Sequence, residues 1–275
     1  MSPIFAVIDI KMDPDIFRLG SFVLAWHGLL TAIGVAVGVW VGARFARRRG
    51  ISEDEIYNIA VVLVIGGIIG ARGLFVLEHL KDFIDRPQDI PRVDAGGISI
   101  YGALIGGTFA TLAYTLWRRL PKARVADACA LGGIVGMAVG RIGDVINGEH
   151  WSRTTDLPWA VRYTHPNTRG QGEPVHPAVA YEMIGDFLVL LILLFVWRRS
   201  QREGYVFWTW VFLYGAMRFG VSFMRVDNLV WMGLRTAQIV ALVAMASAIV
   251  GFYLLSRQKG LTRAERRRRA RLGQL

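Results

Sequence analysis

The fold class of this chain is decided by residues 56–78, IYNIAVVLVIGGIIGARGLFVLE. At about 1.5 Å of rise per residue, a helix of this length crosses a hydrocarbon core of roughly 30 Å. Six further apolar stretches have a similar length, at 21–43, 98–117, 126–146, 177–197, 205–225 and 235–256. With 53% hydrophobic residues in 275, they predict an all-α integral membrane protein built as a bundle of seven transmembrane helices.

The distribution of Lys and Arg predicts how these helices are oriented. Four segments on one side hold 4, 4, 3 and 8 of these residues: 44–50, 118–124, 198–202 and 257–275. The segments on the other side hold 2, 3, 3 and none: 1–20, 79–95, 147–176 and 226–234. By the positive-inside rule the N-terminus lies outside and the C-terminus in the cytoplasm. We therefore expect one transmembrane domain over 1–275, with a small outer cap at about 147–176 and a basic cytoplasmic tail at 257–275.

The net charge of +11 indicates that the chain contacts an anionic partner, either nucleic acid or membrane lipid. A single basic run without stacking aromatic residues or a binding motif is weak support for nucleic-acid binding. Attraction to anionic membrane lipids explains the charge better. Cys129 is the only cysteine, and the sequence contains neither a His-Glu-x-x-His zinc motif nor a phosphate-binding loop. We expect no metal, no cofactor and no nucleic acid, and membrane lipids as partners.

Five cationic residues lie inside or at the edge of predicted spans: Arg72, Arg141, Arg218, Arg225 and Arg235. Burying a cation in a membrane is costly, so a functional site is the default interpretation. The segment GRIGDVINGEHW, residues 140–151, ends the fourth span. Within it Arg141 and Asp144 share a helix face, so a purely structural ion pair is the alternative.

A second pair of arginines lies in the sixth span. Arg218 and Arg225 are seven residues apart and are therefore expected on one helix face, although Arg225 alone could extend outward to the interface. Together with Arg141, they predict a fork-shaped anion site for a lipid phosphate. Arg72 in the second span is a further candidate. Glu182 is expected either to partner an arginine or to stabilise the start of its helix.

Glycines recur every three or four residues within the second, third and fourth spans. This spacing places them on one helix face, where neighbouring backbones approach closely. Near Arg141 and Tyr101 the missing side chains would also leave room for a lipid headgroup and acyl chains. The sequence leaves both interpretations open.

The chain resembles the prolipoprotein diacylglyceryl transferase family of bacterial inner membranes. The resemblance rests on six motifs: Trp26-His27-Gly28, Gly70-Ala71-Arg72, the run from Gly96 to Gly107, the signature from Gly140 to Trp159, His176-Pro177 to Tyr181-Glu182, and Tyr214-Gly215-Ala216 with Arg218. It covers almost the whole chain and implies a multi-pass protein of the bacterial cytoplasmic membrane.

The resemblance also implies a reaction without a cofactor. The diacylglyceryl group of phosphatidylglycerol passes to the lipobox cysteine thiol of a prolipoprotein signal peptide, and glycerol phosphate leaves. Arg141 and Arg218 match the family's essential arginines and are expected to bind the phosphate. Asn147, Gly148 and Glu149 match its signature, and Glu149 is expected to orient an arginine or the lipid glycerol. The motif that contains Tyr214 implies a substrate contact there.

Three of the departures from the family pattern bear directly on the chemistry. Tyr101 stands where many members carry a histidine proposed as the base, and because a phenol is a poor base at neutral pH we expect it to donate or relay a hydrogen bond. His27 stands where tyrosine is common and is a candidate replacement base, although a lone histidine in a membrane is often a packed hydrogen-bonding group. Asp144 replaces a usual asparagine and would oppose phosphate binding unless it is protonated or paired with Arg141.

Two functions from another class remain as alternatives to a transferase. A non-catalytic lipid or peptide binder could be built on the same bundle, and so could a small transporter. A transporter should show matched repeats and broken helices in two halves, and the sequence shows neither.

Overall fold

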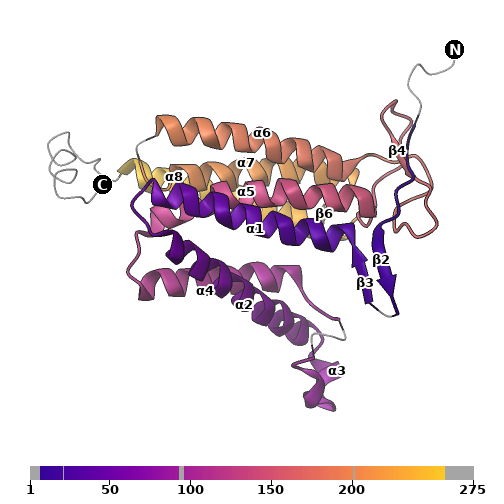
Figure 1. The fold of residues 1–275 in the computed structure, drawn as a ribbon, viewed down its shortest axis with the longest axis horizontal. Coiled ribbons are helices and arrows are strands. Elements are labelled where there is room, and N and C mark those ends of the chain that lie inside the picture. Colours follow the sequence, from indigo (N-terminus) through magenta and orange to yellow (C-terminus); the bar gives the residue numbers. More distant parts are fainter. Residues whose placement is uncertain (1–6, 21, 93–95, 201, 258–275) are drawn as a thin grey trace, which may run out of the picture. The chain divides into compact units, whose positions relative to one another are not determined.

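A computed structural model of the chain describes residues 7–20, 22–92, 96–200 and 202–257. The described part is mostly helical (Figure 1), with helices α1 (Trp26–Arg47), α2 (Glu53–Glu78), α3 (Leu80–Ile84), α4 (Ile100–Trp117), α5 (Lys122–Asn147), α6 (Ala178–Arg199), α7 (Tyr205–Val221) and α8 (Thr236–Arg257). Short 3₁₀ turns follow at Pro87–Asp89 and Ser222–Met224. The predicted basic tail lies, from residue 258 on, outside the described residues.

Six of the described helices are long and apolar enough to cross a membrane: α1, α2, α4, α5, α6 and α8. The prediction of a helical integral membrane protein is thereby confirmed. The sixth predicted span, 205–225, is too long, because α7 ends at Val221 and has 17 residues. The number of seven crossings and their orientation stay predictions.

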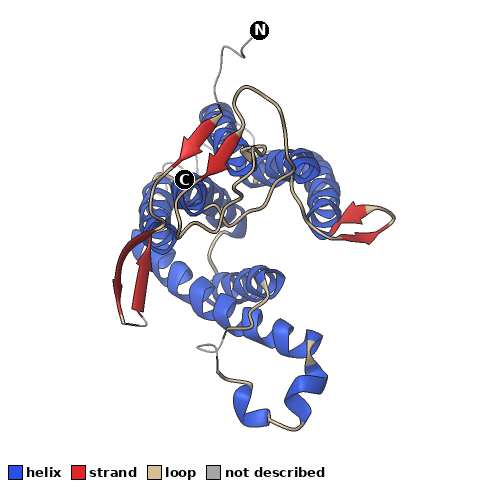
Figure 2. Ribbon diagram, turned by 90° about the vertical axis from the view of Figure 1, so that its right-hand side faces the viewer, coloured by secondary structure: helices blue, strands red, loops and turns tan. Residues whose placement is uncertain are grey.

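Short strands flank the helices, which the all-α prediction did not include (Figure 2). They are β1 (Ile8–Ile10), β2 (Asp15–Leu19), β3 (Phe22–Ala25), β4 (Val161–Tyr163), β5 (Leu229–Trp231) and β6 (Leu234–Arg235). The prediction that the first span begins at residue 21 is wrong, because β3 pairs antiparallel with β2 and α1 starts only at Trp26. The predicted start of the seventh span, residue 235, is likewise one residue too early, because Arg235 belongs to β6 and α8 begins at Thr236.

The chain packs as two compact units, one of Met1–Gly42 with Asp127–Leu275 and one of Ala43–Ala126. The prediction of a single domain therefore stays a prediction. In the second unit, α2 and α4 approach through glycines. A Cβ added at Gly70 would overlap the carbonyl oxygen of Gly102 and lie 2.7 Å from the Cα of Gly106. Small residues are what bring helix backbones this close within a membrane.

The first unit contains a similar glycine contact between α1 and α5. A Cβ added at Gly38 would lie 2.7 Å from the carbonyl oxygen of Gly132 and 3.2 Å from the Cα of Gly136. The packing interpretation is thus confirmed for Gly132 and Gly136, as it is for Gly70. The nearest atom to a Cβ at Gly140 is the Thr31 hydroxyl at 4.0 Å, so backbone contact does not explain that glycine.

The close approach of α2 and α4 predicts that alanine is tolerated at one glycine of α2 and lowers stability at another. Gly70→Ala should lower the free energy of unfolding by roughly 1–3 kcal/mol, because the methyl group forces the backbones apart. Gly73→Ala is the matched control, since its added Cβ meets nothing within 4 Å of the described residues. Thermal unfolding of the two variants in detergent measures the difference. Equal midpoints would show that the glycine contact does not limit the packing of these helices.

Asp127 ties the start of α7 to α5. Its side chain is 1% exposed. One carboxylate oxygen accepts from the backbone N–H of Gly204 at 2.8 Å and the other from that of Phe207 at 2.9 Å. These are backbone donors that the first turn of a helix leaves unpaired, and a carboxylate is also favourable at this end of the helix dipole.

The predicted cap corresponds to the non-helical stretch between the end of α5 and the start of α6. Its strand β4 pairs parallel with β1, so that Val161 lies opposite Ile8. Tyr163 donates from its hydroxyl to the carbonyl of Val145, 2.9 Å away, and burial raises the pKa of Tyr163 to about 12, which keeps the phenol a donor. Gly148 has a φ of +73°, and an added Cβ would lie 2.7 Å from the Cα of Gly170. These contacts hold the cap against the end of α5.

Candidate arginine and carboxylate site

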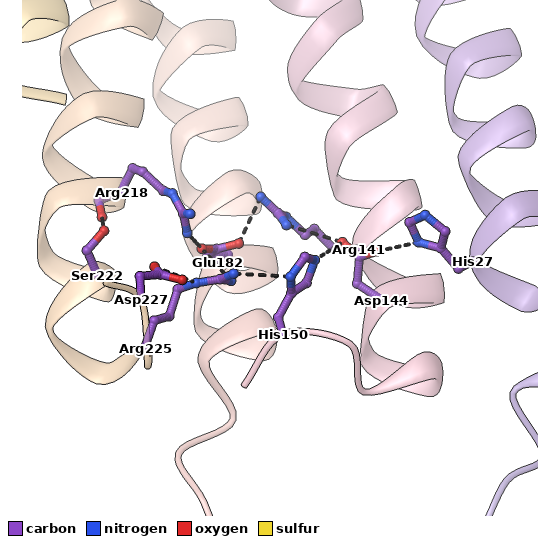
Figure 3. Close-up of polar contacts among 9 residues, drawn as sticks. All are labelled: His27, Arg141, Asp144, His150, Glu182, Arg218, Ser222, Arg225 and Asp227. Atoms are coloured by element: carbon purple, nitrogen blue, oxygen red, sulfur yellow. Dashed lines mark hydrogen bonds and ion pairs between the residues drawn. The ribbon is translucent and has the colours of Figure 1, made fainter. Parts of the chain in front are cut away.

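Glu182 is the centre of the candidate site (Figure 3). Its carboxylate is fully buried, and one of its oxygens lies 2.8 Å from Nη2 of Arg141. The other oxygen pairs with Nη1 of Arg218 and lies 3.6 Å from Nη1 of Arg225. Guanidinium groups from α5, α7 and the segment after α7 therefore meet at one carboxylate of α6. The expectation that Glu182 partners an arginine is confirmed.

Local structure explains how Arg225 reaches this centre. The prediction that Arg218 and Arg225 share a helix face is wrong, because α7 ends at Val221 and Arg225 has an extended backbone after the 3₁₀ turn. Within that turn the Ser222 hydroxyl donates to the carbonyl of Arg218 at 2.7 Å. The turn directs Arg225 inward, so its side chain is 8% exposed and does not extend outward to the interface.

Arg225 also has partners beyond Glu182. Its Nη2 lies 3.1 Å from Nδ1 of His150, and its Nε lies 3.4 Å from a carboxylate oxygen of Asp227. The donors Nε and Nη1 are buried and form no hydrogen bond with the described residues. Each of the two is in ion-pair contact with a carboxylate, Nε with Asp227 and Nη1 with Glu182, but completes no hydrogen bond, so this guanidinium retains donors for an anion.

Asp144 is a second centre, 7% exposed, at the end of α5. It accepts from Nη1 of Arg141 at 3.2 Å, and its other oxygen lies 2.6 Å from Nδ1 of His27, the second residue of α1. Nε2 of His150 is 3.7 Å away. The Arg141–Asp144 ion pair considered from the sequence is present. It is only part of the arrangement, however, because Arg141 bridges Asp144 and Glu182.

The contacts close into a ring, which we call the charged ring. It runs from Asp144 through Arg141, Glu182, Arg225 and His150 back to Asp144. Two residues that are not members of the ring contact its carboxylates: Arg218 pairs with Glu182, and His27 contacts Asp144. Interactions between charges are stronger in such a poorly solvated place than in water, so each member is positioned by two or more neighbours.

Asp186 adds a second fully buried carboxylate, four residues after Glu182 on α6. Neither of its oxygens has a hydrogen-bond partner among the described residues. Asp186 was not among the site residues predicted from the sequence, although a carboxylate one helical turn from Glu182 in an apolar segment is a signal that the sequence contains. His150 and Asp227 were also not among the predicted site residues.

The other predicted residues of the signature lie beside the charged ring. Glu149 pairs with Arg169 of the cap, so it does partner an arginine, but not Arg141. Asn147 is 3% exposed as the last residue of α5, and Gly148 forms the turn after it. Tyr214 lies on α7, one turn before Arg218. Substrate contacts by these residues stay predictions.

Two predicted residues belong to the unit Ala43–Ala126. Arg72 is 8% exposed and donates to four backbone carbonyls, those of Asp89 and Ile90 at 2.7 Å and those of Gly96 and Gly97 at 2.8 Å. It therefore organises the connection between α2 and α4. Tyr101 is the second residue of α4. The proposed substrate contact of Arg72 and the proposed hydrogen-bond role of Tyr101 stay predictions.

The last of the five arginines, Arg235, has a structural contact. It is 6% exposed, and its Nε donates to the carbonyl of Asp227 at 3.2 Å. In the described part of the chain, no group of three or more His, Cys, Asp or Glu side chains is arranged to hold a metal ion.

Comparison with known proteins places these features in a family. Residues 14–254 match the family described as prolipoprotein diacylglyceryl transferase. A phosphatidylglycerol–prolipoprotein diacylglyceryl transferase of Clostridioides difficile (strain 630) is 33% identical over 247 residues, which cover 90% of this chain and 97% of the relative. The protein of that name from Geobacter sulfurreducens is 36% identical over 218 residues, covering 78% and 82%. The one from Nostoc sp. is 33% identical over 247 residues, covering 86% and 87%.

Proposed function

Because the chain belongs to the prolipoprotein diacylglyceryl transferase family, we propose that it carries out the family's reaction at the arginines around Glu182. The enzyme transfers the diacylglyceryl group of phosphatidylglycerol to the thiol of a prolipoprotein, forming a thioether and releasing glycerol phosphate. The observation that supports this location is the meeting of Arg141 and Arg218, from two different helices, at one buried carboxylate.

The charge that develops in the reaction suits these side chains. The thiol sulfur attacks the diacylglyceryl carbon bonded to the phosphate oxygen, and the bond between that carbon and oxygen breaks. Its electron pair stays on the phosphate, whose negative charge rises as glycerol phosphate departs. A guanidinium has five N–H donors, so Arg141 and Arg218 can bind phosphate oxygens while they keep Glu182. Donors placed in advance around the leaving group stabilise the transition state.

The proposed placement in the membrane follows the sequence prediction. The charged ring and the cap face outward, and the chain crosses the cytoplasmic membrane of a bacterium seven times. Arg198 and Arg199 end α6 and Arg257 ends α8, each at the end of its helix remote from the site, as the positive-inside rule requires. Lipid enters between helices at the outer leaflet, and the signal peptide docks beside it.

Purified protein supplied with phosphatidylglycerol and a lipobox peptide tests the function. Mass spectrometry of the peptide should show the added diacylglyceryl mass. A peptide with serine in place of the cysteine is the control and should stay unmodified. Peptide and lipid binding without any added mass would contradict the proposal and favour the non-catalytic binder.

A further inference from the structure

Two histidines contact Asp144 through different ring nitrogens. His27 presents Nδ1, 2.6 Å from one carboxylate oxygen. His150 presents Nε2, 3.7 Å from the other oxygen, while its Nδ1 lies 3.1 Å from Nη2 of Arg225 (Figure 3). The partner of each nitrogen determines which one carries the proton and which one carries the lone pair.

The carboxylate of Asp144 determines which nitrogen of the His27 ring carries the proton. An ionised Asp has only acceptors, and Asp144 already accepts from the guanidinium of Arg141. Nδ1 of His27 must therefore donate, so in the neutral ring Nε2 carries the lone pair. The side chain of His27 is 40% exposed, whereas that of Asp144 is 10% exposed. The arrangement has the features of a base oriented by a carboxylate: one nitrogen held by a buried acid and the other available to a substrate.

For His150 the arginine has the opposite effect. Arginine is only a donor, so Nδ1 of His150 must accept and its lone pair is engaged by Arg225. Nε2 then carries the proton and faces Asp144. A histidine whose lone pair is bound to a guanidinium cannot take a proton without losing that bond. Of the two imidazoles, only His27 is arranged to act as a base.

We infer that His27 is the general base of the transfer reaction, that Asp144 positions it, and that His150 links Asp144 to Arg225 without exchanging a proton. This inference rests on the proposed function. Nε2 of His27 takes the proton of the substrate thiol, and the thiolate forms the sulfur–carbon bond as the carbon–oxygen bond breaks. Glycerol phosphate leaves with the electron pair, and the imidazolium then gives its proton to that phosphate or to water. The base and the phosphate site are connected, because Asp144 contacts both His27 and Arg141.

The test compares histidine variants at saturating lipid and peptide, with and without added imidazole. His27→Ala should lower kcat by about 10²–10⁴-fold, the usual contribution of a general base, while KM for phosphatidylglycerol changes little. Added imidazole should raise the kcat of His27→Ala at least tenfold, because a small base can enter the space left by the missing ring. His165→Ala, in the cap beside Asp13, is the matched control and should retain the wild-type rate.

Two positioning variants complete the test. Asp144→Asn should lower kcat without rescue by imidazole, and His150→Ala should do the same, since neither removes the base itself. Thermal unfolding of each variant separates loss of activity from loss of fold, and His27→Gln serves if the alanine variant does not fold. Full activity of His27→Ala, or a folded inactive variant that imidazole does not rescue, would overturn the inference and leave the proposed function standing. A wild-type protein that makes no thioether would instead overturn the proposed function.

Discussion

Replacing Arg141 by alanine should lower kcat/KM for phosphatidylglycerol by about 10³-fold, the upper range for removal of one preorganised donor to a developing anion. The variant loses the phosphate ligand and also leaves Asp144 and Glu182 without the cation that bridges them. KM for the lipid should rise, which distinguishes this variant from His27→Ala. The measurement is the rate of thioether formation followed by mass spectrometry of the peptide.

Two variants control this experiment. Arg141→Lys keeps the charge but cannot bridge both carboxylates with one planar group, so it should recover only part of the rate. Arg162→Ala removes an exposed arginine of the cap, whose partner is Asp9, and should leave the rate unchanged. Product formation by Arg141→Ala at the wild-type rate would refute its role as a phosphate ligand.

Replacing Glu182 by glutamine should have the largest effect on stability. The variant removes the charge that Arg141, Arg218 and Arg225 share. Loss of one partner from a buried ion pair costs about 3–5 kcal/mol, because the remaining charges stay buried and uncompensated. We expect a lower thermal midpoint together with a rate reduced by about 10²-fold, since the arginines no longer hold their positions.

Asp186→Asn provides the matched control on the same helix. Asp186 is as fully buried as Glu182 but has no hydrogen-bond partner among the described residues. Its replacement breaks no described ion pair and should change the free energy of unfolding by less than about 1 kcal/mol. If both variants lost the same stability, burial of a carboxylate, and not the pairing of Glu182, would be the cause.

The sequence predicted the long apolar helices well and their ends less well. Long apolar stretches are specific for spans, because few soluble proteins contain several of them. Residues 22–25 have the same apolar character as the helix that follows, so hydropathy could not separate β3 from α1. The end of α7 was similarly hidden, because Ser222–Met224 continues the helical pattern while the structure turns.

The candidate site was predictable where its residues stand out in the sequence. Arg141, Arg218 and Glu182 are charged groups in apolar helices, and the cost of burying them indicated partners. The pairing of His27 with Asp144 joins residues 117 positions apart, which no local pattern specifies. Arg72 was also conspicuous, yet its guanidinium contacts backbone carbonyls that hydropathy cannot reveal.

The hydrogen bonds from the start of α7 to Asp127 have a consequence for the lengths of α5 and α7. Arg141 lies 14 positions after Asp127, and Arg218 lies 14 positions after Gly204. Both arginines are therefore about 21 Å along their helices from the hydrogen bond that joins Asp127 to Gly204. Inserting one residue in either interval would shift its arginine by about 1.5 Å and rotate it by about 100°. Insertions and deletions within either interval should therefore be eliminated by selection, because they would remove an arginine from the charged ring or from Glu182.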